Sequence, residues 1–283
     1  MLYINLFSYN TLENLFYLIY HYEIKYMNCK ISSIHYCPVK SISFQSINSC
    51  NITKNFGIEN DRIFAFSRII DLAKAKLIEK NPNERNLNNF LTLKNSPVLN
   101  KYNFVYENKI LTLTKDNKEI ISISAEDQNE RLLLSNKLTE LESSLVKPIT
   151  LLKNNKFPFF DTSHSKNIFN SISLINLESI KDFEKKINKK VETQRFRANF
   201  YVDGIDAWEE RNWIGKIINI NNISFKVEKN IPRCVAINLK PKTDDNSLNL
   251  LTSLKKIYDH FDMGIYLTAL KNGKIELGDK ITQ

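Results

Sequence analysis

The residue best suited to chemistry in this sequence is a cysteine that follows an arginine in the last third of the chain. Cys234 comes directly after Pro232 and Arg233. A neighbouring cation favours the thiolate form of a cysteine, which is the form that attacks electrophiles and binds metals. A buried, inert thiol is the simple alternative.

The other cysteines do not make a metal site by themselves. Cys29, Cys37, Cys50 and Cys234 contain no C-x-x-C pair and lack the spacing of a structural zinc site or an iron–sulfur cluster. Unpaired cysteines of this kind indicate reduced thiols in a cytosol-like compartment. The four histidines are scattered and none is assigned a catalytic role. No nucleophile–base triad, Walker loop or dinucleotide fingerprint is visible.

Arginine is the second candidate for chemistry. Eight of the 40 basic residues are Arg, and four of the eight, Arg195, Arg197, Arg211 and Arg233, follow residue 190. The planar guanidinium binds phosphate through two parallel hydrogen bonds. The net charge of +9 alone is compatible with nucleic acid, an anionic cofactor or a Lys-rich background. Because no dense basic run with interleaved aromatic residues occurs, no nucleic-acid partner is expected, and a basic nucleic-acid-binding β-barrel is kept only as an alternative.

Short alternating segments dominate the chain after Met27 and predict β-strands. Ile42 and Phe44 form one expected strand face, and Phe64 and Phe66 form another. Two hairpins are predicted, one over residues 104–113 that turns at Asn108 and one over residues 218–227 that turns at Asn221-Asn222. A strand at 266–270, a turn at Asn272-Gly273 and a strand at 275–277 close the chain.

Three segments have helical periodicity. Residues 126–146 are predicted as a helix, with Ser124 and Asp127 in a capping-box-like arrangement. A second helix runs over 177–187 with Asn176 as its N-cap, and a third over 251–261. The predicted fold class is therefore α+β and β-rich, built from two strand-rich units.

Six short segments stand out from this patterning: Pro38-Val39-Lys40-Ser41, Gly57-Ile58-Glu59-Asn60-Asp61-Arg62, Arg195-Phe196-Arg197-Ala198-Asn199, Pro232-Arg233-Cys234, Gly264-Ile265-Tyr266 and Gly278-Asp279. In their order along residues 28–283 the sequence resembles a MOSC-domain protein of the mitochondrial amidoxime-reducing component and bacterial YcbX group. The resemblance implies an N-terminal β-barrel-like domain at 27–146, packed against a MOSC β-barrel with a few helices at 147–283. Residues 1–26 are expected to be an extension or a misassigned start, with a membrane-surface helix as the alternative.

The resemblance also implies a molybdenum cofactor, Mo-molybdopterin, held by named residues. Cys234 is expected to be the metal ligand and the catalytic residue. The residues expected to hold the cofactor are Lys40, Ser41, Arg62, Asn176, Ser179, Arg197, Asn199 and Tyr266. Asn176 and Ser179 are added because the N-terminus of a helix offers free N–H groups to an anion. Asp61, Asp203 and Asp279 are expected to be turn and cap residues, and Trp208 and Trp213 to be packing residues.

The sequence departs from the family pattern at two places. Ala198 stands where the family usually has proline, and residues 237–241 read Ile-Asn-Leu-Lys-Pro where the family favours Thr-Thr-Val-Asp-Pro. The second change replaces an acidic residue by a basic one beside the expected metal ligand. We expect these changes to alter substrate specificity more than retention of the cofactor.

The implied activity is that of a cytoplasmic oxidoreductase that reduces small N-hydroxylated or N-oxide compounds. The cofactor carries the difficult chemistry and the protein supplies geometry and charge. No segment resembling a C-terminal iron–sulfur domain is seen before Gln283, so electrons are expected from a separate protein of ferredoxin or cytochrome type. No transmembrane segment is expected. The alternative is a carrier of the molybdenum cofactor, or a sulfur-handling module, without catalysis of its own.

Overall fold

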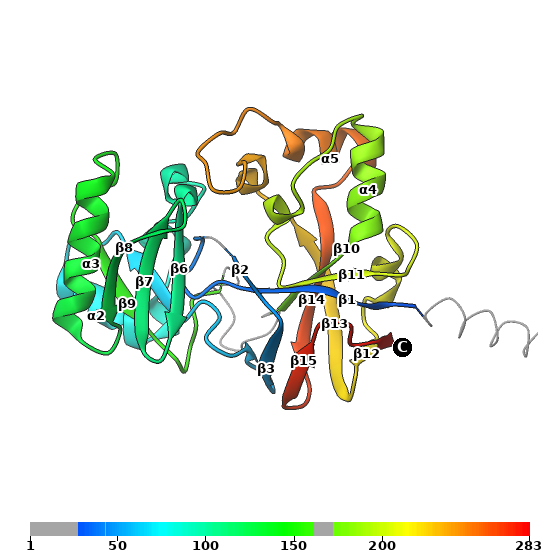
Figure 1. The fold of residues 1–283 in the computed structure, drawn as a ribbon, viewed down its shortest axis with the longest axis horizontal. Helices are drawn as coiled ribbons and strands as arrows, with labels where there is room; N and C mark the ends of the chain where they lie inside the picture. Colours follow the sequence, from blue (N-terminus) through cyan, green and yellow to red (C-terminus); the bar gives the residue numbers. More distant parts are fainter. Residues whose placement is uncertain (1–27, 43, 161–171) are drawn as a thin grey trace, which may run out of the picture.

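The computed structural model describes residues 28–42, 44–160 and 172–283, so the expected extension at residues 1–26 lies outside the described residues. The described residues form two lobes (Figure 1). Four α-helices and sixteen strands in several separate sheets confirm the predicted α+β, β-rich class for this part of the chain.

A large mixed sheet organises the C-terminal lobe. Its strand order in the described residues is β16-β12-β13-β14-β10-β11-β1-β2. The strands are β16 (Ile281–Thr282), β12 (Ile217–Ile220), β13 (Ile223–Pro232), β14 (Asp262–Ala269), β10 (Ile172–Asn176), β11 (Phe200–Asp203), β1 (Lys30–Tyr36) and β2 (Gln45–Ile47). β10 and β11 are parallel, and the other neighbouring pairs are antiparallel.

The large sheet curls until its two ends approach each other. A bridge between Lys30 and Lys280 and a hydrogen bond from the Ile281 N–H to the Cys29 carbonyl join the start of β1 to the residues around β16. No continuous ladder of the described residues closes the sheet into a barrel. The expected MOSC barrel is therefore present in the described residues as a strongly curled sheet, and the N-terminal lobe contains two small open sheets instead of a closed barrel.

The two faces of this sheet bury different cores because successive side chains of a strand point to opposite sides. Leu174 and Phe200 belong to the core inside the curl. Their neighbours Ile175 and Tyr201 face the helices α4 (Leu177–Lys186) and α5 (Leu250–Tyr258), which cover the outer face. Both helices were predicted from their periodicity, and Asn176 caps α4 as expected by accepting a hydrogen bond from the Glu178 N–H.

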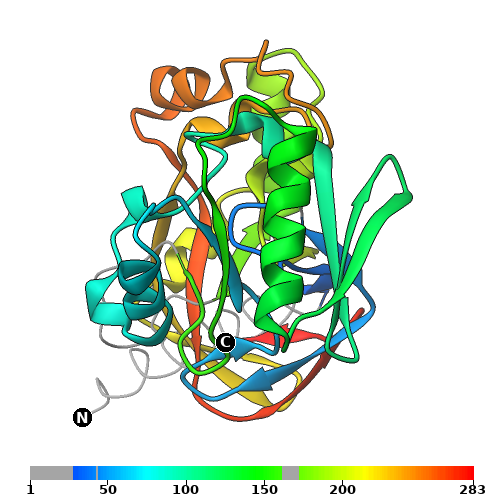
Figure 2. The same ribbon diagram turned by 90° about the vertical axis from the view of Figure 1, so that its left-hand side faces the viewer.

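The N-terminal lobe is built from two small sheets and two helices. β6 (Tyr102–Glu107), β7 (Ile110–Lys115) and β8 (Lys118–Ser124) form one sheet, and β5 (Phe64–Ser67) pairs with β9 (Thr150–Lys153) in the other. The helices are α2 (Leu72–Lys80) and α3 (Gln128–Leu141). Figure 2, which faces this lobe, shows α3 lying in front of the strands.

The β6–β7 hairpin turns at Asn108, and Asn108 and Lys109 both have positive φ, as a tight hairpin turn requires. Asp127 caps α3 as predicted. The helix is shorter than expected, because it ends at Leu141 rather than at residue 146. The third predicted helix also ends early, where Asp259 adopts a left-handed conformation after Tyr258.

The expected strand at Ile42 and Phe44 is wrong. The Ile42 N–H donates to the Val39 carbonyl in a turn, and Phe44 precedes β2. The Ile42 carbonyl accepts hydrogen bonds from Arg197 and from the Cys37 thiol. Side-chain donors therefore occupy the carbonyl that a neighbouring strand would bind. The alternation of Ile42 and Phe44 resembles that of a strand, but no strand forms there.

The N-terminal part of the chain contributes to both lobes. β1 lies within the large sheet, and β3 (Ser49–Thr53) pairs with β4 (Gly57–Ile58) and with β15 (Gly273–Glu276) from the end of the chain. The chain then enters the N-terminal lobe through β5. The division into domains at residues 146 and 147 stays a prediction.

Candidate functional site

A row of four residues crosses four neighbouring strands at one end of the large sheet. Tyr266 of β14 is paired with Ser173 of β10. The Asn199 N–H donates to the Ser173 carbonyl at 3.1 Å, and the His35 N–H of β1 donates to the Asn199 carbonyl at 2.7 Å. The order of the strands thus places two predicted site residues in one row, Tyr266 on β14 and Asn199 directly before β11.

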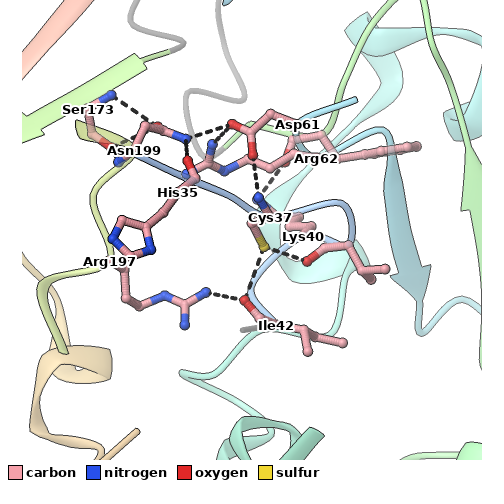
Figure 3. Close-up of polar contacts among 11 residues, drawn as sticks. His35, Cys37, Lys40, Ile42, Asp61, Arg62, Ser173, Arg197 and Asn199 are labelled. Atoms are coloured by element: carbon pink, nitrogen blue, oxygen red, sulfur yellow. Dashed lines mark hydrogen bonds and ion pairs between the residues drawn. The ribbon is translucent and has the colours of Figure 1, made fainter. Parts of the chain in front are cut away.

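Asp61 is the centre of the polar contacts around Asn199 (Figure 3). Its carboxylate accepts hydrogen bonds from the Cys37 N–H at 2.7 Å and from Asn199 Nδ2 at 3.1 Å, and it forms an ion pair with Arg62. Asn199 Nδ2 also donates to the His35 carbonyl, and its Oδ1 accepts from the Ser173 hydroxyl at 2.9 Å. Three segments distant in sequence therefore meet at one carboxylate.

The Asp61 carboxylate is completely buried. Burial raises the pKa of this carboxyl, while the Arg62 guanidinium and the hydrogen bonds from Cys37 and Asn199 oppose that rise. A buried carboxylate of this kind depends on its partners, and removing one of them is costly. The expectation that Asp61 is only a turn residue is too narrow. Sequence reasoning included Asp61 in the Gly-x-x-x-Asp-Arg segment but gave no means of finding its distant partners.

Two predicted cofactor residues lie on the ring of one phenylalanine. The Arg62 guanidinium is 5.0 Å from the centroid of the Phe44 ring, and the Arg197 guanidinium is 5.1 Å from it. Arg197 also donates to the Ile42 carbonyl at 2.6 Å. Aromatic rings attract cations over their faces, so Phe44 holds two positive charges near each other. Phe44 was not among the predicted site residues.

Lys40 joins this group from the Pro-Val-Lys-Ser segment. It is buried, and its Nζ donates to the Phe159 carbonyl at 3.1 Å. The Phe159 N–H donates in turn to the Arg62 carbonyl at 2.8 Å. Phe159 thus links Lys40 to Arg62, and Lys40 adds a cation beside the Asp61–Arg62 ion pair.

Three of the predicted residues have an uncommon backbone conformation. Fourteen residues other than glycine have positive φ in the described chain, and eight of these are Asn or Asp, which tolerate it. The remaining six include Ser41, Arg62 and Arg197, with φ of 63°, 56° and 53°. Each such residue costs about 1–3 kcal/mol, and such strain clusters at functional sites. The three strained residues therefore support a functional role for this region.

Arg233 places the predicted metal ligand beside the same loop. Its guanidinium donates to the Phe196 carbonyl at 2.6 Å and to the Met263 carbonyl at 2.8 Å, so Cys234 follows a residue anchored next to Arg197. Burial lowers the pKa of Arg233, and the nearby Tyr266, Tyr201 and Cys234 side chains oppose that shift. Cys234 is exposed, whereas Cys29, Cys37 and Cys50 are buried.

Asn176 and Ser179 do not join the other predicted residues. Asn176 is paired with Val202, so it lies near the end of β11 opposite to Arg197. The Ser179 hydroxyl donates to the Glu210 carboxylate at 2.8 Å, and Asn176 Nδ2 lies 3.3 Å from the same carboxylate. The N-terminus of α4 does face an anion, but that anion is a buried side chain of this chain.

A hollow lies between the lobes, on the side of Phe44 and Arg197. It is bounded by the loop after Cys234 and by the start of β6. Its lining residues are Phe44, Asn100, Asn103, Gln194, Arg195, Arg197, Ala236, Leu239, Pro241 and Lys242. Asn100 holds the loop in place, because its Nδ2 donates to the carbonyls of Lys240 at 2.7 Å and Thr243 at 2.6 Å.

The site combines an exposed thiol, several cations and a concave surface. Such an arrangement can bind an anionic group and leave one thiolate available to a metal. The described residues contain no cluster of three or more His, Cys, Asp or Glu side chains that could hold a metal ion by themselves. A metal held here by this part of the chain would thus need further ligands from elsewhere.

Comparison with known proteins finds similarity in the C-terminal region. The MOSC domain family matches residues 161–282. Mitochondrial amidoxime reducing component 2 of Rattus norvegicus is 30% identical over a region that covers 39% of this chain and 36% of that protein. Molybdenum cofactor sulfurase of Drosophila melanogaster is 32% identical over 38% of this chain and 14% of that protein. The chain thus matches about a third of the first of these relatives and a smaller share of the second.

Among solved structures, the YUAD protein from Bacillus subtilis has a TM-score of 0.42 at 10% identity, and the match covers 89% of this chain and 93% of that one. YiiM from Geobacillus stearothermophilus has a TM-score of 0.32 at 18% identity, over 39% of this chain and 52% of that one. Within the described ranges, no helix has the length and apolar character needed to cross a bilayer.

Proposed function

Because the chain carries a MOSC domain at residues 161–282, we propose that it binds a molybdenum cofactor and reduces small N-hydroxylated or N-oxide compounds. The electrons come from a separate protein of ferredoxin or cytochrome type. The similarity to a mitochondrial amidoxime reducing component supports this choice of reaction. Two electrons and two protons convert the N–OH group to N–H and release water, and this oxygen removal is the chemistry that the cofactor supplies when bound.

The side chains around Phe44 and Cys234 are of the kinds that a molybdenum cofactor requires. Cys234 offers an exposed thiol, and a thiolate is a donor that molybdenum bound by sulfur accepts. Lys40, Arg62 and Arg197 provide positive charge for the phosphate of the cofactor. The observation that carries the proposal is the placement of the Arg62 and Arg197 guanidinium groups within 5.0 and 5.1 Å of the same Phe44 ring centroid, beside the loop that bears Cys234.

The other predicted residues take supporting parts in the proposal. Ser41 extends the Lys40 segment, and Tyr266 lies across β10 from Asn199. The Asn199 amide is already engaged by His35, Asp61 and Ser173, so it positions Arg62 through Asp61. Asn176 and Ser179 hold Glu210 and are left out of the proposed cofactor set.

The test is metal and pterin analysis of protein purified from a host that makes the cofactor. We expect molybdenum and pterin near one equivalent in the wild type, and reduction of benzamidoxime by a chemical electron donor. Cys234→Ser is expected to lose the reduction, while Ser46→Ala, at an exposed position of β2, keeps both molybdenum and activity. Wild-type protein without molybdenum or pterin would refute the proposal.

A carrier of the cofactor is the second candidate, favoured by the similarity to a molybdenum cofactor sulfurase. A carrier would also contain molybdenum, but it would release the cofactor to an acceptor protein and would not reduce benzamidoxime. Molybdenum-loaded protein that shows no reduction with a chemical donor, and that restores activity to a cofactor-free molybdenum enzyme, would establish this alternative.

A further inference from the structure

Asn103 is a polar residue in the wall of the hollow between the lobes, and its side chain is available to a ligand there. Asn103 lies on β6 and is 9% exposed. Its strand neighbours Tyr102 and Phe104 are part of the core of the N-terminal lobe. Because successive side chains on a strand point to opposite faces, the Asn103 side chain points away from that core, toward the hollow that it lines.

The Asn103 side chain forms no hydrogen bond within the described residues. Asn100, which also lines the hollow, differs in this respect, because its amide donates hydrogen bonds to two carbonyls. The fully buried side-chain polar atoms that lack a partner in the described residues do not include those of Asn103, so its amide reaches the solvent in the hollow. A ligand in the hollow can therefore form hydrogen bonds with this amide, which offers both a donor and an acceptor.

The charge of the hollow selects the kind of ligand. The described lining includes the basic residues Arg195, Arg197 and Lys242 and contains neither Asp nor Glu. Arg195 is paired with Glu192 at 2.6 Å, which balances its charge. Lys242 is exposed at the rim and forms no ion pair within the described residues. The hollow is thus positively charged at its mouth, which favours an organic anion.

The remaining wall is apolar. Phe44, Leu239 and Pro241 line the hollow together with Ala236, which is two residues after Cys234. An aromatic ring can pack against Phe44 in such a pocket, and a few polar groups then fix its orientation. Leu239 and Pro241 belong to the segment where this sequence departs from the family pattern.

The geometry points to a substrate pocket for carboxylate-bearing aromatic compounds. In this pocket Asn103 forms a hydrogen bond with the N-hydroxylated group of the substrate, and Lys242 binds its carboxylate. This inference rests on the proposed function for the reaction, because the hollow lies beside the loop that bears Cys234. It adds a specificity-determining residue from the N-terminal lobe, outside the matched MOSC region.

The test is calorimetric binding of two probes, 4-carboxybenzamidoxime and benzamidoxime, to the purified full chain. We expect the wild type to bind the carboxylated probe about tenfold more tightly, since one ion pair or charged hydrogen bond is of that size. Asn103→Leu, which keeps the volume and removes both hydrogen-bonding groups, should weaken both probes about tenfold. Lys242→Ala should weaken only the carboxylated probe, and Lys256→Ala, an exposed lysine on α5, should weaken neither.

Several outcomes would overturn the inference. These are absence of binding, equal affinity of the wild type for the two probes, or unchanged affinities in both Asn103→Leu and Lys242→Ala. Loss of molybdenum from Asn103→Leu with unchanged probe binding would assign Asn103 to the cofactor and would also overturn it. Because Lys242 lies on an exposed loop, its variant remains informative if Asn103→Leu does not fold. Failure of the proposed function is seen separately, as wild-type protein that lacks molybdenum but binds the probes with the expected preference.

Discussion

Asn199 donates a hydrogen bond from its Nδ2 to the Asp61 carboxylate at 3.1 Å, although the two residues are 138 positions apart in the chain. Arg62 follows Asp61 directly, and Arg197 precedes Asn199 by two residues. This contact therefore helps to fix the relative position of the two loops that bring guanidinium groups to Phe44. The position of the Arg62 and Arg197 guanidinium groups therefore depends on the uncharged Asn199 amide and on the Asp61 carboxylate.

Replacing Asp61 by Asn is expected to weaken both the fold and the site. Both oxygens of the Asp61 carboxylate accept hydrogen bonds, from Cys37, Asn199 and Arg62. An asparagine has only one such oxygen, and its NH₂ group would face one of these donors. It also leaves the Arg62 guanidinium without its buried counter-ion. We expect a loss of about 3 kcal/mol in the free energy of unfolding, measured by urea denaturation, and a fall in molybdenum content.

The matched control is Asp116→Asn in the exposed β7–β8 turn. Its free energy of unfolding should stay within about 0.5 kcal/mol of the wild type, as expected for a surface substitution. Asp61→Asn protein that is as stable as the control and equally rich in molybdenum would show that the Asp61 network does not hold the site.

Local patterns predicted the elements well wherever neighbours in sequence decide the structure. Asn176 was identified as the N-cap of α4 because capping is a contact over two residues. The β12–β13 hairpin was identified because its turn residues and alternation are adjacent in sequence. The role of Asp61 could not be predicted in this way, because its partners Cys37 and Asn199 are 24 and 138 residues away.

The same limit explains the expectation for Asn176 and Ser179. The positive end of a helix attracts an anion, and the expectation was that this anion is the phosphate of the cofactor. Which anion it binds depends on the fold, which brings Glu210 to this position from 31 residues beyond Ser179. A rule that considers only the helix cannot distinguish a bound phosphate from a carboxylate of the same chain.

Glu210 gives a prediction for the dependence of stability on pH. Burial raises the pKa of this carboxyl, and hydrogen bonds from Ser179 and Asn176 oppose the rise. A raised pKa means that the folded state holds the proton more tightly than the unfolded state, so wild-type stability falls as pH increases above about 4.3, the ordinary value for Glu. Glu210→Gln removes this titration.

We therefore expect the free energy of unfolding of the wild type to fall relative to Glu210→Gln between about pH 4.5 and pH 7, measured by urea denaturation at steps of one unit. Glu209→Gln serves as the control, because Glu209 is its half-buried neighbour in η5 (Glu209–Trp213). A wild type that gains stability relative to Glu210→Gln over this range would contradict the assignment.

Asn100 is expected to hold the loop that follows Cys234. Asn100→Ala removes the hydrogen bonds to Lys240 and Thr243, each with a net contribution of about 0.5–1.5 kcal/mol. We expect a loss of about 2 kcal/mol in the free energy of unfolding and faster amide hydrogen exchange over residues 240–245. Asn88→Ala, at an exposed position of η2 (Leu87–Asn89), should change neither. Unchanged exchange in Asn100→Ala would rule out this role.

The cysteines should differ sharply in reactivity. Burial raises the pKa of Cys29 and of Cys50 to about 12 and that of Cys37 to about 11, so these thiols stay protonated and shielded at pH 8. Cys234 is exposed. Iodoacetamide followed by mass spectrometry should modify only Cys234 in folded cofactor-free protein and should modify none in the molybdenum-loaded protein. Equal modification of Cys234 in both forms would argue against its role as the metal ligand.

Arg197 tests whether the site needs a guanidinium or only a positive charge. Its guanidinium donates to the Ile42 carbonyl and lies on the Phe44 ring, and a lysine ammonium cannot reproduce both contacts together with a bidentate bond to phosphate. We expect Arg197→Lys to retain about a tenth of the wild-type molybdenum after dialysis, equivalent to about 1.4 kcal/mol of binding. Arg68→Lys, outside the site, should retain the wild-type content. If Arg197→Lys binds molybdenum as well as the wild type while Arg197→Gln does not, charge alone is sufficient and the bidentate contact is not used.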